Sequence, residues 1–300
     1  MTETTDSQSP PAHAADRLIE AIERLAAPVC VGIDPVVERL PAVTESGKDP
    51  QIAAGAIRSF VLGLLDAAAD CVPCVKFQSA CFERYGHRGI AILEELIAEA
   101  RQRNLQVILD AKRGDIGISA DHYAAAVFDS AADRSPHWLT INSYLGEDGI
   151  QPFLREGRGA FALVRTSNPG GDALQRQKLA DGRTIAECVA GMIAAIGRDF
   201  VGKSGYSALG AVVGATRSED AAKLRKLMPQ QIFLVPGYGA QGGGVQDVLP
   251  CFNVRGRGAI VTASRSVIYA FEKDRTDWQL SVTEAAKRFA DEIGSAVGLR

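Results

Sequence analysis

Short apolar runs rich in β-branched residues recur at fairly even intervals along this chain, and a longer segment of helical periodicity follows nearly every one. This alternation is typical of repeated βα units, which build parallel sheets. The predicted strands are Val29–Ile33, Cys74–Phe77, Gln106–Leu109, Trp138–Ile141, Phe161–Val164, Ala211–Val213, Ile232–Val235 and Ala259–Val261. The clearest predicted helices are Ile52–Ala69, Gly89–Arg103, Ala120–Ser130, Thr184–Arg198 and Glu219–Leu227. Eight strands with intervening helices predict an α/β fold, a single (β/α)8 TIM barrel.

An open, doubly wound sheet is the alternative architecture. Such a sheet normally carries a G-x-G-x-x-G turn after its first strand, and Gly32-Ile33-Asp34-Pro35 does not match that pattern. No stretch rich in Pro, Gly or Ser divides the chain, so residues 13–300 are expected to form one catalytic barrel domain. Residues 1–12 are polar and contain two prolines, which predicts a disordered tail.

Charge and composition exclude several classes of protein. The net charge of −3 and the pI near 5.9 provide no basic face, so nucleic acid is not an expected partner. No uninterrupted apolar run approaches the ~18 residues of a membrane span. The first residues also lack the apolar stretch of an export signal, so we expect a cytoplasmic protein without a membrane partner.

Cysteine spacing suggests a metal or redox site only weakly. Cys71 and Cys74 form a C-x-x-C pair and Cys81 follows, but no second pair or suitably spaced histidine completes four zinc ligands. Buried free thiols in a reducing compartment are the favoured interpretation. His87, His122 and His137 have no partner spacing and are expected to be structural.

Charged side chains follow the predicted strands at the end where barrel enzymes place their active sites. Asp34 follows the first strand, Lys76 lies in the second, and Asp110-x-Lys112-x-x-Asp115 follows the third. Because side chains alternate along a strand, Asp110 and Lys112 should project to the same side. A structural salt-bridge network is one explanation. An acid–lysine array prepared for a reaction that changes charge is the other.

This stretch resembles the D-x-K-x-x-D signature of the orotidine 5'-phosphate decarboxylase family. The resemblance extends from about Pro28 to Ser266 and includes the Asp and Lys of the first two strands. Its further motifs are Thr166-Ser167-Asn168-Pro169-Gly170, Pro236-Gly237-Tyr238-Gly239-Ala240-Gln241-Gly242-Gly243 and Ser264-Arg265-Ser266. The Arg-Gly pair inside the signature and the long polar tail look most like the longer bacterial branch of the family.

The resemblance implies conversion of orotidine 5'-phosphate to uridine 5'-phosphate and CO2, in pyrimidine biosynthesis, without a cofactor or metal. It implies that Lys112 stabilises and protonates a carbanion at C6 of the ring. The implied catalytic residues are Lys76, Asp110, Lys112 and Asp115. The implied substrate-binding residues are Asp34, Ser119, Ser167, Pro236, Gln241, Gly242, Gly243, Ser264 and Arg265.

Within that set, each group has an expected part of the substrate. Ser167 is expected at the pyrimidine, and Asp34, Lys76 and Ser119 at the ribose hydroxyls. Ser119 is equally well explained as a helix N-cap. The loops after the last two strands are expected to bind phosphate, because barrels often bind it there through backbone N–H groups.

The resemblance also implies a homodimer in which Asp115 reaches the neighbouring subunit's site. Three alternatives stay open: a Mg2+-dependent sugar-phosphate decarboxylase or hexulose-phosphate synthase, a Schiff-base aldolase, and a barrel that binds nucleotides without turnover. Lys76 opposes a divalent cation, and the acids beside Lys112 favour its protonated form over an amine nucleophile. No role is assigned to Arg113, Asn142 or Arg165.

Overall fold

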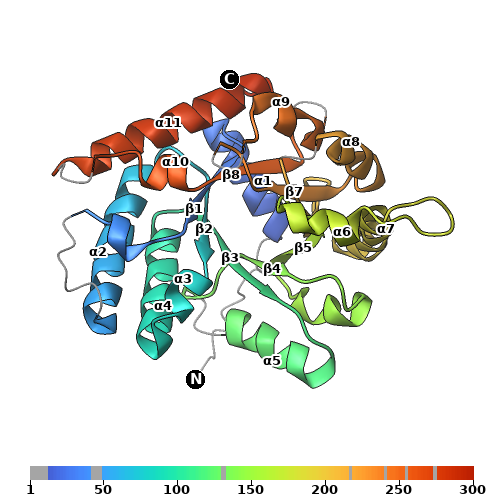
Figure 1. The fold of residues 1–300 in the computed structure, drawn as a ribbon, viewed down its shortest axis with the longest axis horizontal. Coiled ribbons are helices and arrows are strands. Elements are labelled where there is room, and N and C mark those ends of the chain that lie inside the picture. Colours follow the sequence, from blue (N-terminus) through green and yellow to red (C-terminus); the bar gives the residue numbers. More distant parts are fainter. Residues whose placement is uncertain are drawn as a thin grey trace, which may run out of the picture.

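Eight parallel strands, paired in sequential order, close into a barrel surrounded by helices (Figure 1). The computed structural model describes residues 13–41, 49–129, 133–215, 218–239, 242–253, 256–272 and 276–300. The strands are β1 (Val29–Ile33), β2 (Cys74–Gln78), β3 (Gln106–Arg113), β4 (Trp138–Ile141), β5 (Gly159–Arg165), β6 (Ser207–Val213), β7 (Gln231–Val235) and β8 (Ala259–Ala263). The predicted TIM barrel is confirmed. The predicted tail, residues 1–12, lies outside the described residues.

Helices follow the strands, and a further helix precedes the first strand. The α-helices are α1 (Ala14–Leu25), α2 (Pro50–Ala68), α3 (Ala80–Glu83), α4 (Gly86–Gln102), α5 (Gly117–Phe128), α6 (Asp172–Gln175), α7 (Ile185–Gly197), α8 (Ser218–Leu227), α9 (Val245–Val248), α10 (Arg265–Ile268) and α11 (Trp278–Ala296). Short 3-10 helices are η1 (Val37–Arg39), η3 (Glu147–Gly149), η4 (Gln151–Phe153), η5 (Pro169–Gly171), η6 (Arg198–Phe200) and η7 (Leu249–Cys251). Each of the five predicted helices corresponds to one of these, within a few residues at each end.

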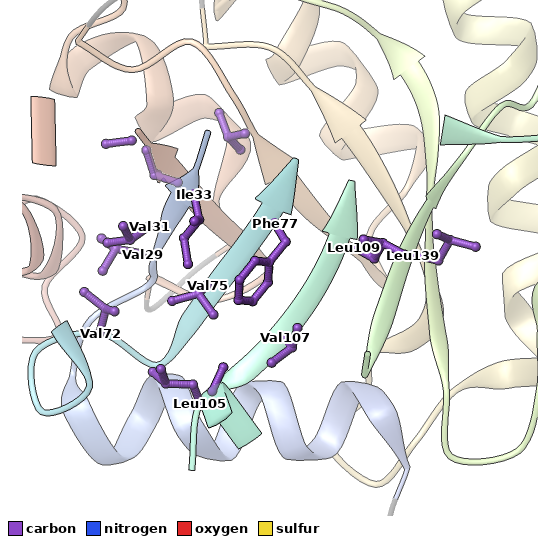
Figure 2. Close-up of a cluster of buried hydrophobic side chains, with 14 of the residues drawn as sticks. Val29, Val31, Ile33, Val72, Val75, Phe77, Leu105, Val107, Leu109 and Leu139 are labelled. Atoms are coloured by element: carbon purple, nitrogen blue, oxygen red, sulfur yellow. The ribbon is translucent and has the colours of Figure 1, made fainter. Parts of the chain in front are cut away.

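Alternation along the strands separates two apolar cores. One side chain in two faces the surrounding helices, and this outer core includes Val31, Ile33, Val75, Phe77 and Val107 (Figure 2). The other side chains fill the barrel interior. The interior core includes Cys30, Cys74, Ile108, Trp138 and Phe161 together with Leu18, Ile19 and Ile22 of α1. Helix α1 therefore packs its apolar face against the interior layer and closes the amino end of the barrel.

Helix α2 is the one described helix whose length and composition would suit a membrane span. Its segment Gln51–Ala68 has a mean hydropathy of 1.3, although Arg58 and Asp66 interrupt the apolar run. Half of this segment is buried, and α2 packs against α4 and α11. That is the packing of an outer barrel helix.

Candidate active site

A cavity of about 290 Å³ lies at the carboxyl ends of the strands. Most of the predicted site residues line it: Asp34, Lys76, Asp110, Lys112, Ser167, Pro236, Ser264 and Arg265. Further lining residues are Gln78, Thr140, Leu163, Thr166, Asn168, Val212, Leu234, Gly237, Tyr238 and Thr262. The motifs that are dispersed in sequence thus meet in one concave site at the barrel mouth.

Asp110 is the centre of the charge array. The residue is 8% exposed, and its carboxylate lies between two ammonium groups, with Lys76 Nζ 2.8 Å from Oδ2 and Lys112 Nζ 2.7 Å from Oδ1. Thr140 donates its hydroxyl to Oδ1 at 2.8 Å, and Gln78 donates its amide to Oδ2 at 3.3 Å. The predicted placement of Asp110 and Lys112 on the same side of β3 is confirmed.

The ionisation of this array follows from its geometry. Burial alone would raise the pKa of Asp110, but the positive charges of Lys76 and Lys112 hold it well below its usual range. Burial alone would lower the pKa of Lys76, which is 5% exposed, but the negative charges of Asp110 and Asp34 raise it. The pair is therefore ionised at neutral pH, and Asp110 is available as a fixed negative charge.

Lys112 sits in a backbone conformation that few non-glycine residues adopt. Its φ is 46°, in the left-handed region, and the β3–β4 register shifts between Leu109 and Arg113. The Lys112 amide donates to Thr140 Oγ1 at 3.0 Å, which holds this turn in place. Strained residues of this kind are concentrated at functional sites, where surrounding contacts maintain them. Here the bulge carries β3 four residues past its predicted end.

Asp34 has an acceptor that no described residue uses. Its buried Oδ1 atom lacks a hydrogen-bond partner among the described residues, and so does Thr262 Oγ1 on the same cavity wall. The Tyr269 hydroxyl fixes the backbone here by donating to the Asp34 carbonyl and accepting from the Val36 amide. A buried oxygen without a partner is costly, so Asp34 Oδ1 is suited to accept a hydrogen bond from a bound hydroxyl, and Thr262 Oγ1 is suited to accept or donate one.

A glycine allows the first and last strands to approach at this wall. A Cβ atom on Gly32 would lie 2.0 Å from Ser264 Oγ. Any larger residue at this position would displace Ser264 from the cavity.

Three lining residues that the sequence analysis missed lie in register with those it found. Gln78 is two residues after Lys76, Thr262 is two before Ser264, and Thr140 is the third residue of β4. Strand alternation brings each of them to the interior. Counting in steps of two from the charged residues would have identified Gln78 and Thr262.

Asp115 and Ser119 do not line the cavity of their own subunit. Asp115 lies in the loop between β3 and α5, where its Oδ1 accepts the Ile116 amide at 2.8 Å. Ser119 is exposed at the third position of α5, whose N-cap is Ile116. The N-cap explanation of Ser119 is therefore wrong.

The loop after β7 is closed by its own hydrogen bonds. The Gly242 amide donates to the Gly239 carbonyl at 2.9 Å, and the Gly243 amide donates to the Gly237 carbonyl at 3.3 Å. Gly242 has a φ of 87°, which requires glycine. Binding of phosphate by these two amides stays a prediction and would have to replace these hydrogen bonds. Gln241 lies outside the described residues.

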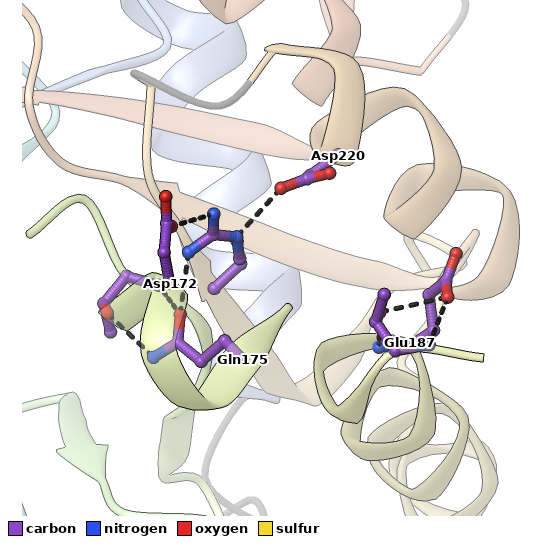
Figure 3. A network of polar contacts seen from close by, with 7 residues as sticks. Asp172, Gln175, Glu187 and Asp220 are labelled. Atoms are coloured by element: carbon purple, nitrogen blue, oxygen red, sulfur yellow. Dashed lines mark hydrogen bonds and ion pairs between the residues drawn. The ribbon is translucent and has the colours of Figure 1, made fainter. Parts of the chain in front are cut away.

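Arg165 is explained by a network behind the cavity. Its guanidinium is fully buried and pairs with Asp172 on α6 and with Asp220 on α8 (Figure 3). It also donates to Gln175 Oε1 at 3.1 Å, and the same oxygen accepts the Thr166 amide at 2.9 Å. Gln175 donates in turn to Thr166 Oγ1 at 2.8 Å. Arg165 therefore anchors the loop that carries Thr166 and Ser167 into the cavity.

Other residues considered in the sequence lie outside the cavity lining. Arg113 pairs with Glu83, and Asn142 Oδ1 accepts the Tyr144 amide at 3.0 Å. His87 and His122 are exposed, and His137 lies at the opposite end of the barrel. Cys71 and Cys74 are buried free thiols, and Cys81 is a half-buried one. Across the described part of the chain, no group of three or more His, Cys, Asp or Glu side chains is placed to hold a metal ion.

Comparisons with known proteins find similarity over most of the chain. The family model described as "Orotidine 5'-phosphate decarboxylase / HUMPS family" matches residues 27–276. A Rhodopirellula baltica protein named orotidine 5'-phosphate decarboxylase is 42% identical over 300 residues, covering 93% of this chain and 98% of that protein.

Solved structures give the same result. One from Streptomyces avermitilis, provisionally assigned as an orotidine 5'-phosphate decarboxylase, is 33% identical with a TM-score of 0.83, covering 97% of this chain and 98% of that one. The structure of Leishmania donovani OMP decarboxylase is 29% identical with a TM-score of 0.77, covering 95% of this chain and 99% of that one.

Proposed function

The chain belongs to the orotidine 5'-phosphate decarboxylase / HUMPS family, and on this premise we propose that it converts orotidine 5'-phosphate to uridine 5'-phosphate and CO2 in pyrimidine biosynthesis. The observation that carries the proposal is the alternating array of Lys76, Asp110 and Lys112 at the wall of the mouth cavity. The lysines of such an array attract an anionic substrate, and its aspartate places a fixed negative charge next to the carboxylate of that substrate.

In the proposed mechanism, the bond between C6 and the carboxyl carbon breaks, CO2 leaves, and the electron pair stays at C6. Lys112 Nζ, held 2.7 Å from Asp110 Oδ1, stabilises the developing negative charge and then donates a proton to C6. Solvent reprotonates the lysine. The fixed charges match the transition state better than the bound substrate, which is the requirement for rate enhancement. The reaction as proposed needs no electron sink, metal or other cofactor.

The remaining cavity residues are proposed to bind the substrate. Asp34 Oδ1 is suited to accept a ribose hydroxyl, because it has no hydrogen-bond partner among the described residues, and Lys76 lies beside it. Ser167 is proposed at the pyrimidine. Arg265, at the exposed rim, is proposed to bind phosphate, because a guanidinium can contact two phosphate oxygens at once.

Gly242, Gly243 and Ser264 are the other proposed phosphate ligands, and Pro236 and Gln241 are further proposed substrate-binding residues. Of these five, Pro236 and Ser264 line the cavity. Ser119 is exposed and outside the cavity of its own subunit, so a ribose contact from it would have to be made in a neighbouring subunit.

We also propose a homodimer in which Asp115 completes the partner's site. Asp115 is absent from its own cavity lining, and exposed apolar side chains surround its loop: Ile116, Ile118, Tyr123, Tyr144 and Leu145. These side chains lie on α5 and on the loops after β3 and β4, and the two loops are adjacent, since a Cβ on Gly149 would lie 3.4 Å from the Asp115 carbonyl oxygen. A gathered apolar patch on a protein surface is typical of an interface. A cytoplasmic location is also expected for this biosynthetic enzyme.

The proposed activity can be tested directly. Purified protein should convert orotidine 5'-phosphate to uridine 5'-phosphate, with a fall in substrate ultraviolet absorbance that is the same with and without EDTA. Activity that EDTA abolishes would instead favour a metal-dependent relative. Tight uridine 5'-phosphate binding without turnover would favour a nucleotide-binding barrel. Neither alternative has specific support in the cavity, where Lys76 occupies the position that a cation would need beside Asp110.

A further inference from the structure

A second cavity, of about 230 Å³, lies at the amino end of the barrel beside α1. Its lining includes Arg17 and Arg24 of α1, Arg101 of α4, Gln106 of β3, and His137 before β4. Gln106 is the first residue of β3, whereas Asp110 and Lys112 near the other end of that strand face the mouth cavity. The two cavities share no lining residue.

Positive charge is concentrated around this second cavity. Arg101 donates to the Ser135 carbonyl at 3.0 Å, Arg17 to the Gly157 carbonyl at 2.6 Å, and neighbouring Arg158 to the Pro136 carbonyl at 3.0 Å. These carbonyls orient the guanidinium groups without neutralising them. Across the described residues, neither Arg101 nor Arg158 has a carboxylate within ion-pair distance.

The ionisation of the neighbouring groups shows the effect of this charge. The pKa of His137 is lowered to about 2, mainly by burial and further by the positive charges of Arg101, Arg17 and Arg158. Burial, then the charges of Arg101 and Arg17, lower the pKa of Arg158 to about 10. Nearby carboxylates are exposed Glu20 on the lining, and Asp133 and Asp129, which act on Arg101 and Arg158 at longer range.

Two uncharged side chains beside the arginines, His137 and Gln106, add hydrogen-bonding groups to this cavity. The Val107 amide donates to His137 Nδ1 at 3.0 Å, so the neutral ring carries its proton on Nε2 and is a donor there. Gln106 is 8% exposed and its buried Oε1 has no partner among the described residues. An amide can turn by half a rotation and present its N–H2 instead. Gln106 therefore has unused hydrogen-bonding capacity beside the cavity.

We propose that this cavity is an anion site that binds a phosphate group, held by the guanidinium groups of Arg17, Arg24 and Arg101 and by the side chains of His137 and Gln106. Guanidinium groups bind tetrahedral oxyanions through paired, charge-assisted hydrogen bonds. A bound anion also offsets the mutual repulsion of the half-buried Arg17 and Arg101, which the backbone carbonyls leave in place. The ligand is free phosphate or the phosphate group of a larger metabolite, and the site is distinct from the phosphate position proposed at Arg265.

The test is calorimetric titration with inorganic phosphate at constant ionic strength, against a chloride blank. The Arg265→Ala variant removes the proposed phosphate ligand at the mouth and should retain binding at the amino end. Adding Arg101→Met to that variant should weaken the remaining binding by ~10-fold or more, because a charged, partly buried contact is lost. Equal phosphate affinity with and without Arg101→Met would overturn the proposal.

A second variant protects the test against misfolding. Arg24 is exposed on α1, so Arg24→Met should leave the fold intact and weaken phosphate binding by ~3-fold. Arg288→Met, at an exposed position of α11, loses the same charge outside the cavity lining and should leave the affinity unchanged. A loss of affinity in Arg288→Met equal to that in Arg24→Met would show a general charge effect and contradict the proposed site.

The source of the phosphate group is distinguished by comparing ligands. A uridine nucleotide and inorganic phosphate are titrated into the Arg265→Ala variant, and the Nε2–H resonance of His137 is followed by NMR. A shift of that resonance with inorganic phosphate assigns the site to the free ion. A shift at lower concentration with the nucleotide assigns it to the metabolite. If neither ligand shifts it, the proposal is wrong.

Discussion

At the carboxyl end of the barrel, Lys76 and Lys112 both face the carboxylate of Asp110, whereas at the amino end Arg101 and Arg158 face backbone carbonyl oxygens. The first arrangement is electrostatically satisfied within the protein and holds an oriented carboxylate ready to act on a substrate. The second keeps net positive charge in a cavity. One barrel thus carries a balanced charge array at one end and an unbalanced one at the other, and loss of a charge should cost more stability in the balanced array than in the unbalanced one.

The largest expected effect is the loss of activity on replacing Lys112, in the cavity at the carboxyl end of the barrel. Lys112→Ala is expected to lower kcat by at least ~10³-fold, since the proposed proton donor and stabilising charge are lost together. The left-handed backbone at Lys112 is equally strained in both proteins, so a loss of unfolding free energy should come only from the lost ion pair with Asp110. Turnover is measured from the loss of substrate absorbance, with exposed Lys287→Ala as the control. A kcat in Lys112→Ala equal to that of the wild type would contradict the proposed mechanism.

Neutralising the centre of the balanced array should affect both activity and stability. Asp110→Asn leaves two ammonium groups facing each other and is expected to cost ~3 kcal/mol in unfolding free energy and to reduce kcat. The matched control is Asp129→Asn, which removes a more exposed pairing with Arg155 and should cost less than ~1 kcal/mol. Urea unfolding of the two variants measures the difference.

The pH dependence of that difference has a definite sign. The folded-state pKa of Asp110 is depressed, so its contribution to stability is fully present above the unfolded carboxyl pKa of ~3.9. The gap between wild type and Asp110→Asn should therefore be constant from neutral pH to ~5 and shrink as the pH falls below ~4. A gap that already closes near neutral pH would show that Asp110 is not ionised as described.

The sequence predicts those features of the fold and the site that leave a local pattern of apolar or charged residues. Hydrophobic periodicity located the strands, because a buried strand needs a run of apolar residues. The periodicity predicted that β3 ends at Leu109, whereas the strand continues to Arg113. This continuation was not predicted because residues distant in sequence stabilise it, namely Lys76, Thr140 and Ile141. Charged residues of the site were found because charge at a strand end is conspicuous, while Thr140 was missed because a threonine in a strand is not.

The amino end was not predictable from local pattern at all. The segment Ala14–Leu25 is amphipathic, but nothing local shows that its apolar face packs against the barrel interior. The convergence of Arg17, Arg101 and His137 requires that packing, because they come from α1, from α4 and from the start of β4. The same is true of Arg165, whose partners on α6 and α8 lie 7 and 55 residues away in the chain.

Two arginines sharpen the comparison between paired and unpaired charge. Arg165→Met should cost ~3 kcal/mol, because two half-buried carboxylates lose their partner. Arg101→Met should change stability by less than ~1 kcal/mol, since the lost hydrogen bond to Ser135 is offset by relief of repulsion. Equal costs in urea unfolding would contradict the distinction drawn here.

Arg165→Met should also alter the kinetics in a way that a structural role alone would not. Release of the loop at Thr166 is expected to raise KM by ~10-fold with a smaller change in kcat, because binding contacts are lost without loss of the reacting group. Arg165→Lys keeps a positive charge but cannot make all the bonds of the guanidinium, so partial rescue of KM is expected. An unchanged KM in Arg165→Met would show that the loop does not depend on this network.

At the amino end, the expected effect is a change in the pH dependence of stability. Folded His137 has its pKa lowered to about 2, while the unfolded residue takes up a proton below ~6.5. Stability contributed by the neutral ring is thus present above ~6.5 and is lost as the pH falls, by up to ~1.4 kcal/mol per pH unit. His137→Gln should lack this component of the slope between pH 6 and 4, whereas His122→Gln, at an exposed position, should keep it.

Phosphate makes this slope a probe of the unbalanced cavity. An anion beside His137 favours the protonated ring and raises its folded-state pKa, so the two states differ less in proton uptake. The wild-type slope should therefore be shallower in phosphate than in chloride at equal ionic strength, and the slope of His137→Gln should be the same in both. Identical wild-type slopes in the two salts would mean that no anion approaches His137, and the amino end would then hold its positive charge without a ligand.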